Sequence, residues 1–356
     1  MNISSIPQAL RRQHMQRFSG MHQRGLSLIE FLIAITLGLM IVTALTVLIA
    51  QQSATQAEFE KSSRQIENGR YAMQILSDDL QMAGYYGEFT NVAGLAVPAT
   101  LSDPCSTTAS AIEAALPFAV QGYDALPATG GGTAVTCIAA SNFKPGTDIL
   151  VVRRVEPASA AVGAAVANQI YVQSGLTASG LEFTKKMDLG SNAGTFDLFN
   201  KDRTSLATLR RALVHIYFVS PCSVTPCNSL SDGGKPIPTL KVMELTTAGM
   251  TLTPLVEGIE NMQIDYGIDT TADGSPDGAF VAAPAAAASA SWANVMALRV
   301  YLMVRNNESS PGYTDTKTYT LGTSGAATAP VGATAFKRRV FSQLIRLTNP
   351  SGRRDQ

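Results

Sequence analysis

The chain has 356 residues and equal numbers of basic and acidic side chains, 27 of each, so its formal net charge is zero. A balanced charge argues against general nucleic-acid binding, which needs a basic surface. The charged fraction is low, 15%, and small residues are abundant, which suits a secreted or surface protein and indicates no enzyme class.

The first 24 residues form a basic leader. It contains no Asp or Glu, and its four arginines are Arg11, Arg12, Arg17 and Arg24. Because positive charge holds a flanking segment on the cytoplasmic side of a membrane, we expect the leader to stay inside and the bulk of the chain to be exported. Met21 is an alternative start that would give a shorter leader.

An apolar run from Leu26 to Ala50 follows, with Glu30 as its one charge. A membrane-spanning helix needs ~20 mostly apolar residues, so this run can cross a bilayer. A carboxylate in hydrocarbon is costly unless it is paired, which makes Glu30 a candidate functional residue. A cleaved secretory signal is disfavoured because Leu48 stands where a small residue is needed, and a plain anchor leaves Glu30 unexplained.

The segment Gly25-Leu26-Ser27-Leu28-Ile29-Glu30, preceded by Arg24, resembles the class III signal of type IV prepilins. The resemblance implies that a prepilin peptidase cuts after Gly25 and methylates Leu26 as the new amino terminus. It also implies that Glu30 sets the register of subunits during assembly. An opposite charge at low dielectric is a strong partner for a carboxylate, and the cationic amino terminus of a neighbouring subunit would supply one.

The helix is expected to continue to about Ala83, because no proline occurs between Leu26 and Ala83. Apolar residues recur along one face of its second part. The stripe consists of Phe59, Ile66, Met73, Leu76, Leu80 and Ala83. This pattern predicts packing on a β-domain, with a parallel coiled coil as the alternative, and Gly84 is expected to cap the helix. The expected parts are a leader (1–25), a membrane or filament-core half of the helix (26–50), a periplasmic half (51–84) and a globular domain (85–356).

A second resemblance extends beyond the signal. The segments from Ile66 to Met73 and from Leu80 to Gly87 resemble minor pilins of the PilW type. This implies partners among other minor pilins, the major pilin and the inner-membrane pilus assembly machinery. It also implies an inner-membrane, single-pass protein that passes to a periplasmic or cell-surface pilus.

The globular part is expected to be rich in β-structure. Residues 89–142 read as a long, mostly irregular excursion, and β-type runs follow it. These runs are 148–155, 169–173, 181–184, 212–219, 240–246, 262–268, 295–305, 317–321 and 336–347. No second long helical pattern separates them, so the sheet should be mainly antiparallel. The expected fold is therefore α+β and pilin-like, with a long amino-terminal helix packed on a mainly antiparallel domain with long loops.

Three shorter segments have specific expectations. Residues 282–291 form an Ala/Ser/Pro-rich loop, with a short helix as the alternative. The run Lys337-Arg338-Arg339 is interpreted as a solvated strand face rather than a basic patch. The last seven residues, from Pro350, are expected to form a frayed tail.

The chain has four cysteines in a part expected to reach an oxidising compartment. Four cysteines allow three pairings, and we favour Cys105 with Cys137 and Cys222 with Cys227. The second pair flanks a tight proline-bearing loop, and the first would close the irregular excursion. Metal binding is disfavoured because no CxxC or adjacent His is present.

A weak calcium motif follows the run that ends at residue 268. Its oxygen ligands would come from Asp269, Thr271, Asp273 and Asp277, with Gly274 at the sixth position. Thr271 replaces the usual Asp or Asn, and the twelfth position is Phe280 instead of Glu. A turn of Asp, Gly and Pro needs no metal, so a plain turn is the alternative. No other cofactor is indicated.

No catalytic constellation is apparent. His215 is the one histidine of the exported part and is interpreted as a partly buried strand residue. We therefore expect a non-enzymatic minor pilin that takes part in type IV pilus assembly or initiation. The alternatives are a minor pseudopilin of type II secretion and a membrane-anchored periplasmic enzyme or adhesin.

Overall fold

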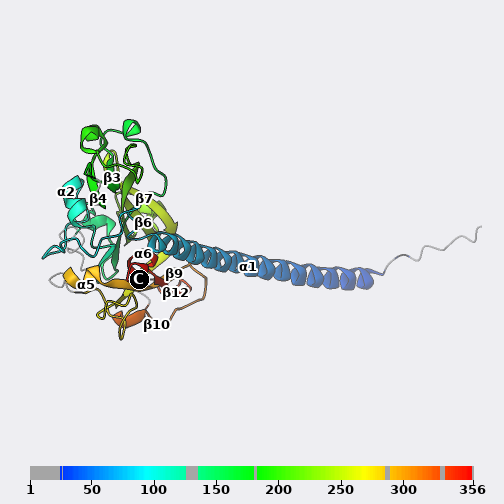
Figure 1. Cartoon of the computed structure of the whole chain (residues 1–356). Helices are drawn as coiled ribbons and strands as arrows, with labels where there is room; N and C mark the ends of the chain where they lie inside the picture. The colour runs from blue at the N-terminus through cyan, green and yellow to red at the C-terminus, as the bar shows by residue number, and fades with distance from the viewer. Residues whose placement is uncertain are drawn as a thin grey trace, which may run out of the picture. The chain divides into compact units, whose positions relative to one another are not determined.

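The computed structural model describes residues 25, 27–125, 135–179, 183–284, 289–328 and 333–354 (Figure 1). The predicted leader up to Arg24, and Leu26, lie outside the described residues. The chain divides into two compact units, one ending at Ala57 and the other beginning at Glu58. The two are described separately below.

The long helix is α1, Leu28–Gln81, 54 residues without a break. The sequence predicted a helix from Leu26 to about Ala83, and the observed bounds agree within two residues. Gly84 follows with a φ of +71°, the left-handed conformation that ends a helix and that glycine adopts without strain. The amide of Tyr85 donates to the carbonyl of Met82 at 3.0 Å and closes this last turn.

In the second unit, α1 buries one face in the domain. The buried residues of this face are Gln65, Gly69, Ala72, Met73, Leu76, Ser77, Asp79 and Leu80. The predicted stripe was wrong at its start, because the Phe59 side chain is 74% exposed. Burial instead begins at Gln65, and Gly69 lets the Phe341 ring occupy the space that a Cβ would fill.

The larger sheet has seven strands in the order β1-β2-β5-β3-β4, with β6 added to β5 and β7 to β6. Their bounds are β1 (Val120–Tyr123), β2 (Ile149–Val155), β3 (Ile170–Leu176), β4 (Phe183–Leu189), β5 (Leu209–Ser220), β6 (Thr239–Thr246) and β7 (Gly249–Glu257). The twelve-residue β5 organises this sheet, because it pairs antiparallel with β2, β3 and β6.

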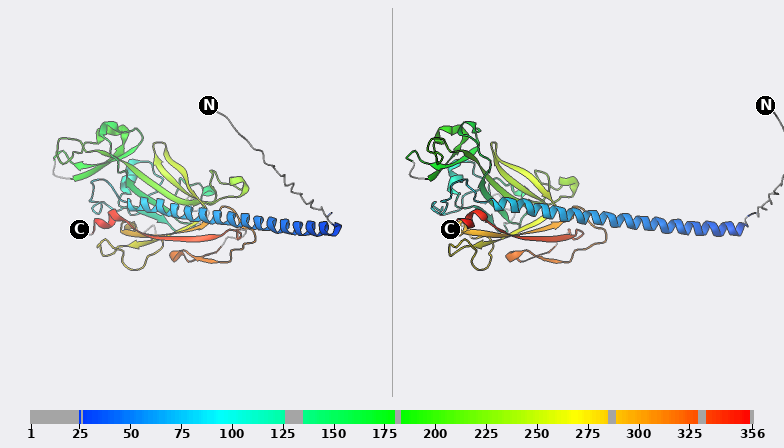
Figure 2. Two further views of the ribbon diagram at one scale, coloured as in Figure 1. Left: turned by 90° about the vertical axis from the view of Figure 1, so that its right-hand side faces the viewer. Right: turned by 45° about the vertical axis from the view of Figure 1, so that its right-hand side comes forward.

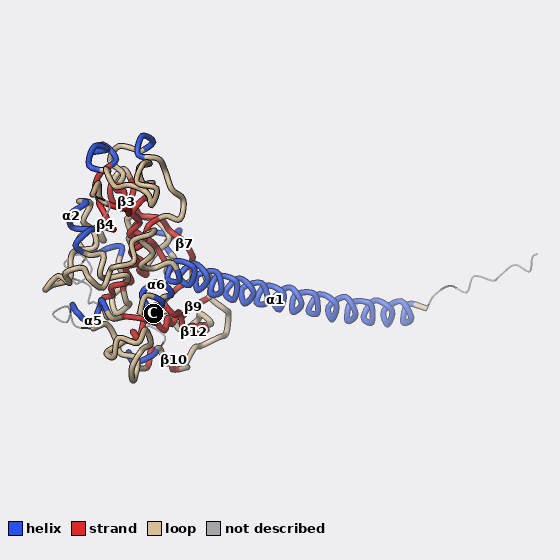
Figure 3. The backbone as a smooth tube through the Cα atoms, viewed as in Figure 1, coloured by secondary structure: helices blue, strands red, loops and turns tan. Residues whose placement is uncertain are grey.

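A second sheet has the order β12-β9-β8. Its strands are β8 (Ile259–Ile268), β9 (Val295–Arg305) and β12 (Arg338–Arg346), and a small hairpin pairs β10 (Thr318–Thr320) with β11 (Ala326–Thr328). Every strand pairing in the described residues is antiparallel, so the α+β fold expected from the sequence is confirmed. Figure 3 shows the strands joined by long loops, as expected.

Two hydrophobic clusters hold these layers together. The first joins the buried face of α1 to one face of the large sheet and to the β8–β9–β12 sheet; its members include Leu76, Leu80, Val152 and Leu298. In Figure 2, the part of α1 from Glu58 lies between the green strands and the orange-to-red strands. The second cluster covers the opposite face of the large sheet with residues from the loop after α1 and from 112–143.

The excursion predicted for 89–142 is therefore a cover for that sheet face. The part of it that the structure describes, which leaves out residues 126–134, is mostly loop and contains the short helix α2 (Ala109–Ala114), the strand β1 and a 3₁₀ turn, η1 (Ala140–Asn142). The other short helical segments are η2 (Val162–Ala164), η3 (Gly190–Thr195), α4 (Ser231–Gly234), α5 (Ser289–Ala293) and η4 (Gly322–Ser324). α5 places a helix at the end of the Ala-rich segment, of which residues 285–288 lie outside the described part.

The expectation of a frayed carboxyl-terminal tail was wrong for residues 350–354. The segment forms α6, Thr348–Gly352, and Ser351 within it is completely buried. The Ser351 hydroxyl donates to the carbonyl of Gly274 at 2.6 Å, and the Arg353 guanidinium donates to the carbonyl of Gly84 at 2.6 Å. These bonds fix this segment against the loop that contains Gly274 and against the turn that follows α1.

The burial of α1 leads to a stability prediction. We expect Leu80→Ala, at a fully buried position, to lower the free energy of unfolding by about 2–5 kcal/mol, because it removes contacts and leaves a cavity. Phe59→Ala, on the same helix but exposed, should change it by less than about 0.5 kcal/mol. Urea unfolding of the full chain in mild detergent, followed by Trp292 fluorescence, measures both. Equal effects of the two substitutions would contradict this packing.

Candidate functional site

The start of α1 carries the residues predicted to act in processing and assembly. Gly25 and Ser27 precede the helix, and Glu30 lies in its first turn. The Ser27 amide donates to Glu30 Oε2 at 3.1 Å, and the Ile29 amide donates to Ser27 Oγ at 3.3 Å. This resembles a capping box: the Glu30 carboxylate satisfies the free amide of Ser27, while the Ser27 hydroxyl accepts from the amide of Ile29. Among the described residues, Glu30 therefore has a neutral hydrogen-bond partner and no cationic one.

The helix that follows Glu30 is a candidate membrane anchor. Within the described residues, α1 is the one helix long and apolar enough to cross a membrane, and none of its most apolar stretch is buried. Side chains such as Leu28, Ile41 and Ile49 are each at least 60% exposed. So much contiguous apolar surface is unstable in water and needs lipid or other protein as its surroundings.

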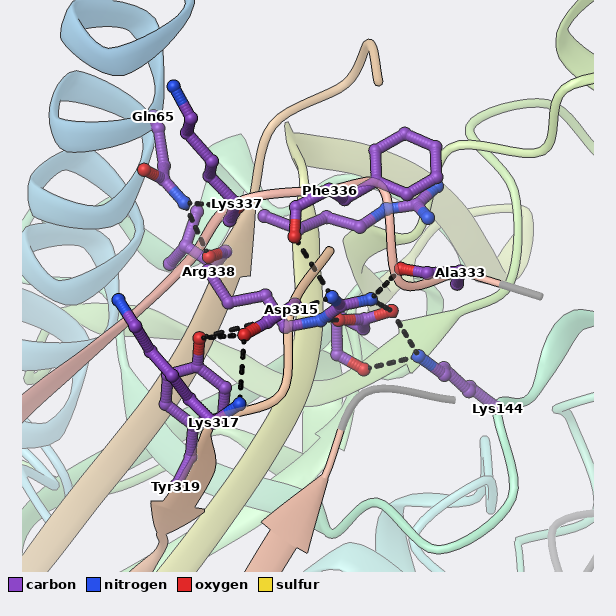
Figure 4. A network of polar contacts seen from close by, with 12 residues as sticks. Gln65, Lys144, Asp315, Lys317, Tyr319, Ala333, Phe336, Lys337 and Arg338 are labelled. Atoms are coloured by element: carbon purple, nitrogen blue, oxygen red, sulfur yellow. Dashed lines mark hydrogen bonds and ion pairs between the residues drawn. The ribbon is translucent and has the colours of Figure 1, made fainter. Parts of the chain in front are cut away.

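In the second unit, polar side chains of α1 fasten the helix to the strand ends. Gln65 donates from Nε2 to the carbonyl of Val304 at 2.8 Å and to that of Lys337 at 2.9 Å (Figure 4). Glu58 forms an ion pair with Lys337 at 2.5 Å and accepts a hydrogen bond from Ser310. The bond from Lys337 is the main reason that the pKa of Glu58 is lowered to about 2. Helix α1 is thus held at β9 and at the start of β12.

A buried ionic cluster lies beside this contact, centred on Arg338 (Figure 4). Arg338 Nε donates to Glu260 Oε2 at 2.5 Å, and Nη1 donates to Asp315 Oδ2 at 3.1 Å. Lys144 approaches Glu260 at 3.8 Å, and the Tyr319 hydroxyl donates to Asp315. The interpretation of Lys337-Arg338-Arg339 as a solvated face was therefore wrong at Arg338, whose side chain is fully buried.

Asp79 is the second buried carboxylate that joins α1 to the sheets. Arg154 Nε donates to its Oδ1 at 2.6 Å, while His215 Nδ1 and the Tyr217 hydroxyl donate to its Oδ2 at 2.8 and 2.9 Å. Burial alone would raise the pKa of Asp79, but the hydrogen bond from His215 and the charges of His215 and Arg154 outweigh it and lower the pKa. The carboxylate is therefore ionised and bound by three strand residues.

His215 is the partner that sequence analysis placed in a strand without a role. Its side chain is 14% exposed, which agrees with a partly buried residue. Burial alone would lower its pKa, but its interactions with Asp79 and Glu244 raise the pKa to about 9. Sequence analysis did not single out Asp79, because an acidic residue beside Leu80 on a helix is ordinarily expected to face the solvent. Only the register of α1 against β2 and β5 brings these groups together.

The cysteines form two disulfides. Cys105 pairs with Cys137 and Cys222 with Cys227, with Cα–Cα distances of 5.5 and 5.7 Å. These are the pairs that the sequence favoured among the three alternatives. The first closes a 32-residue separation within the cover of the large sheet.

The loop proposed as a calcium motif is closed by an arginine. Asp269 is 1% exposed, and Arg354 Nη1 donates to its Oδ2 at 2.9 Å. The amides of Ala272 and Gly274 also donate to this carboxylate, at 2.6 and 2.9 Å. Asp277 Oδ2 accepts the amides of residues 270 and 271, and Asp273 Oδ1 accepts that of residue 275. The oxygens thus serve an Asp-based turn, and the described residues hold no group of three or more His, Cys, Asp or Glu suited to a metal.

Comparison with known families gives one match. The model of the family described as type IV pilus-assembly protein W, PilW, matches residues 216–349. No curated protein and no solved structure gives a match. The matched segment runs from within β5 into α6 and contains Arg338, Glu260, Asp315 and Tyr319 of the Arg338 cluster, but not Lys144. The match supports the PilW family and an involvement in type IV pilus assembly in general. The members of that family are components of pilus assembly and are not known as enzymes.

The Asp79 cluster leads to a prediction for pH dependence. The pKa of His215 is about 9 in the folded protein against an ordinary 6.5, so its stabilising charge is fully present below pH 6.5 and is lost as the pH rises through 9. We expect the wild type to lose about 2–3 kcal/mol across this window through His215. His215→Gln cannot titrate and should lack this part of the loss.

Urea unfolding at pH 6, 7.5 and 9 measures the difference between the two proteins. The comparison with the variant is needed because other groups titrate in the same window, among them Lys144, whose pKa burial lowers to about 8. Parallel pH profiles for wild type and variant would rule out a charged His215.

Proposed function

We propose that this protein is a minor pilin that takes part in the assembly or initiation of type IV pili. The match to the pilus-assembly family over residues 216–349 supports the pathway, and the unburied apolar segment of α1 supports a subunit that is anchored and then packed among other helices. The observation that carries the proposal is a carboxylate, Glu30, at the start of that apolar segment. A plain anchor would need only the capping bond with Ser27, which an uncharged glutamine could also make.

In this proposal the chain is cut after Gly25, and Leu26 becomes an N-methylated amino terminus. Glu30 then leaves or shares its capping bond with Ser27 and pairs with the cationic amino terminus of a neighbouring subunit. The amide of Ser27 is a neutral donor, whereas an ammonium group at low dielectric is a far stronger partner for a carboxylate. The pairing would place subunits at one axial register.

Within the second unit, the contacts between α1 and the strands would fix the β-domain at one position along the helix. Gln65 and Asp79 bind α1 to the strands at two levels of the helix, through two carbonyls and three side chains. The domain therefore cannot slide along the helix without breaking buried hydrogen bonds, which are costly to leave unmade. Its partners would be other minor pilins, the major pilin and the inner-membrane assembly machinery.

The proposal predicts the mature amino terminus. We expect mass spectrometry of the protein from piliated cells to find N-methylated Leu26, and to find the uncut leader when the prepilin peptidase is absent. A cut near Ala50, or an intact leader in functional protein, would instead indicate a secretory signal or a plain anchor.

Deletion of the gene separates the pilus role from that of a type II secretion pseudopilin. A pilus subunit predicts loss of piliation without loss of protein secretion.

Two substitutions of Glu30 separate its charge from its capping role. Glu30→Gln can keep the capping box, since glutamine serves at that position, but it removes the charge. Glu30→Ala removes both. If charge pairing sets register, both variants should insert in the membrane normally yet enter filaments at least tenfold less than wild type. Glu67→Ala, an exposed glutamate further along α1, is the matched control and should enter normally.

The measurement is the amount of the subunit in sheared filaments relative to that in membranes. Normal incorporation of Glu30→Gln, with a defect only in Glu30→Ala, would show that capping matters and that charge pairing does not.

A further inference from the structure

The sheet β12-β9-β8 has two outer edges, and the one on β8 is covered by loops. In an antiparallel sheet, alternate residues of an edge strand turn their amide and carbonyl away from the neighbouring strand. Along β8 these are the even-numbered residues from 260 to 268. Each of them forms at least one outward hydrogen bond. The partners are Lys144 for residue 260, Asp148 for residues 262 and 264, Val281 for residue 266 and Asp277 for residue 268.

The outer edge of β12 has no such cover. Just beyond the strand, the Leu347 amide donates to the carbonyl of Met296, so the odd-numbered residues of β12 turn their backbone groups toward β9. The amides and carbonyls that face outward belong to Val340, Ser342 and Leu344. None of them has a hydrogen-bond partner among the residues that the structure describes. Leu344 is 56% exposed, so this edge is open to another strand.

A groove of about 300 Å³ lies between this edge and α1. One wall is formed by residues 341–343 of β12, and the other includes Arg70 and Asp78 of α1. The side chain of Gln343 donates to Ser77 Oγ at 3.3 Å, so the odd-numbered side chains of β12 lie on the α1 side of the sheet. A strand added to β12 would therefore direct alternate side chains into this groove.

α1 and β12 run in the same direction along the groove (Figure 2). Gln65 binds the carbonyl of Lys337 at one end, and Ser77 accepts its bond from Gln343 further along both elements. A strand that pairs antiparallel with β12, as every pair of described strands does, would therefore pass Asp78 before it reaches Arg70.

The groove offers one charge of each sign. Arg70 and Asp78 are both exposed, and neither forms an ion pair with a described residue. Eight residues of helix separate them, a rise of about 12 Å. Two residues of a strand that are four positions apart lie on one face and about 13 Å apart. A bound strand can therefore place a basic residue at Asp78 and an acidic residue, four positions later, at Arg70.

We propose that the open edge of β12 binds an extended segment of a partner polypeptide, antiparallel to β12, with a basic residue followed four positions later by an acidic one. The extended backbone supplies the donors and acceptors that Val340, Ser342 and Leu344 lack. A second copy of β12 is a poor occupant, because that strand contains three arginines and no acidic residue to meet Arg70. The inference goes beyond the proposed role of Glu30 and uses only the second unit.

The test uses a fluorescein-labelled peptide with blocked ends, Thr-Lys-Val-Thr-Val-Glu-Thr, and the full chain in a non-ionic detergent. Its second, fourth and sixth side chains would face α1, and its third and fifth residues would turn their backbone groups toward β12. We expect saturable binding by fluorescence anisotropy. The peptide in which Lys and Glu are exchanged should bind at least tenfold more weakly.

Methylated peptides test whether the backbone makes the contact. Methylation of the amide nitrogens of the third and fifth residues should weaken binding at least tenfold, because it removes the donors that face β12. The matched control is methylation at the fourth and sixth residues, whose amides face away from β12, and it should weaken binding much less.

Two variants assign the binding to this edge. Ser342→Pro removes an amide hydrogen that β9 does not use and should weaken binding at least tenfold, whereas Ser342→Thr should bind like wild type. Arg70→Glu combined with Asp78→Lys reverses both charges of the groove and should prefer the exchanged peptide. Both residues are exposed, and thermal unfolding checks that each variant keeps its fold.

Four results would overturn the proposal. These are absence of saturable binding, equal weakening by the two methylation patterns, an unchanged peptide preference in the folded charge-reversed variant, and a dimer in the absence of peptide. The dimer counts only if hydrogen exchange shows the amides of Val340, Ser342 and Leu344 protected in it, because a second copy would then be the occupant. The wild-type and methylation results do not depend on any variant, and none of the four bears on the cut after Gly25.

Discussion

The Asp79 carboxylate is almost completely withdrawn from water, and the surroundings keep it charged. A buried carboxylate without partners would be protonated or would exclude the helix from the core. Arg154 on β2 and both His215 and Tyr217 on β5 supply its donors. The position of α1 against the large sheet therefore follows from one electrostatic requirement. The hydrophobic contacts of Leu76 and Leu80 add energy, but apolar contacts do not by themselves specify an axial position.

The two parts of α1 differ in how many of their faces are buried, although the helix is continuous. Up to Ala57 its apolar side chains are exposed on all sides, as suits a helix surrounded by lipid or by other helices. From Gln65 onward only one face is buried, and that face includes glutamine, glycine and aspartate. The proposed role as an anchored subunit of a filament would use both parts, because one would meet other molecules and the other holds the chain's own domain.

Sequence reasoning succeeded where local chemistry decides the structure. The bounds of α1 follow from the absence of proline and from Gly84, and β9 was predicted at Val295–Arg305 because its side chains are apolar on both faces. It missed β1, which has four residues, and β7, which contains Pro254 and exposed threonines at the edge of the sheet. It also missed Asp79 and Arg338. A charge in a strand or on a helix is read as solvent-facing, and only tertiary pairing makes it a buried group.

The two arginines after α6 show how much a neighbouring charge decides. Arg354 neutralises Asp269 in the loop of residues 269–277, and this ion pair fastens the carboxyl-terminal segment to the fold. Arg353, one residue earlier, donates to the carbonyls of Asn349 and Gly84 and lies 6.0 Å from the centre of the Tyr86 ring. Carbonyls satisfy the hydrogen bonds of a guanidinium but, unlike the Asp269 carboxylate, do not neutralise its charge.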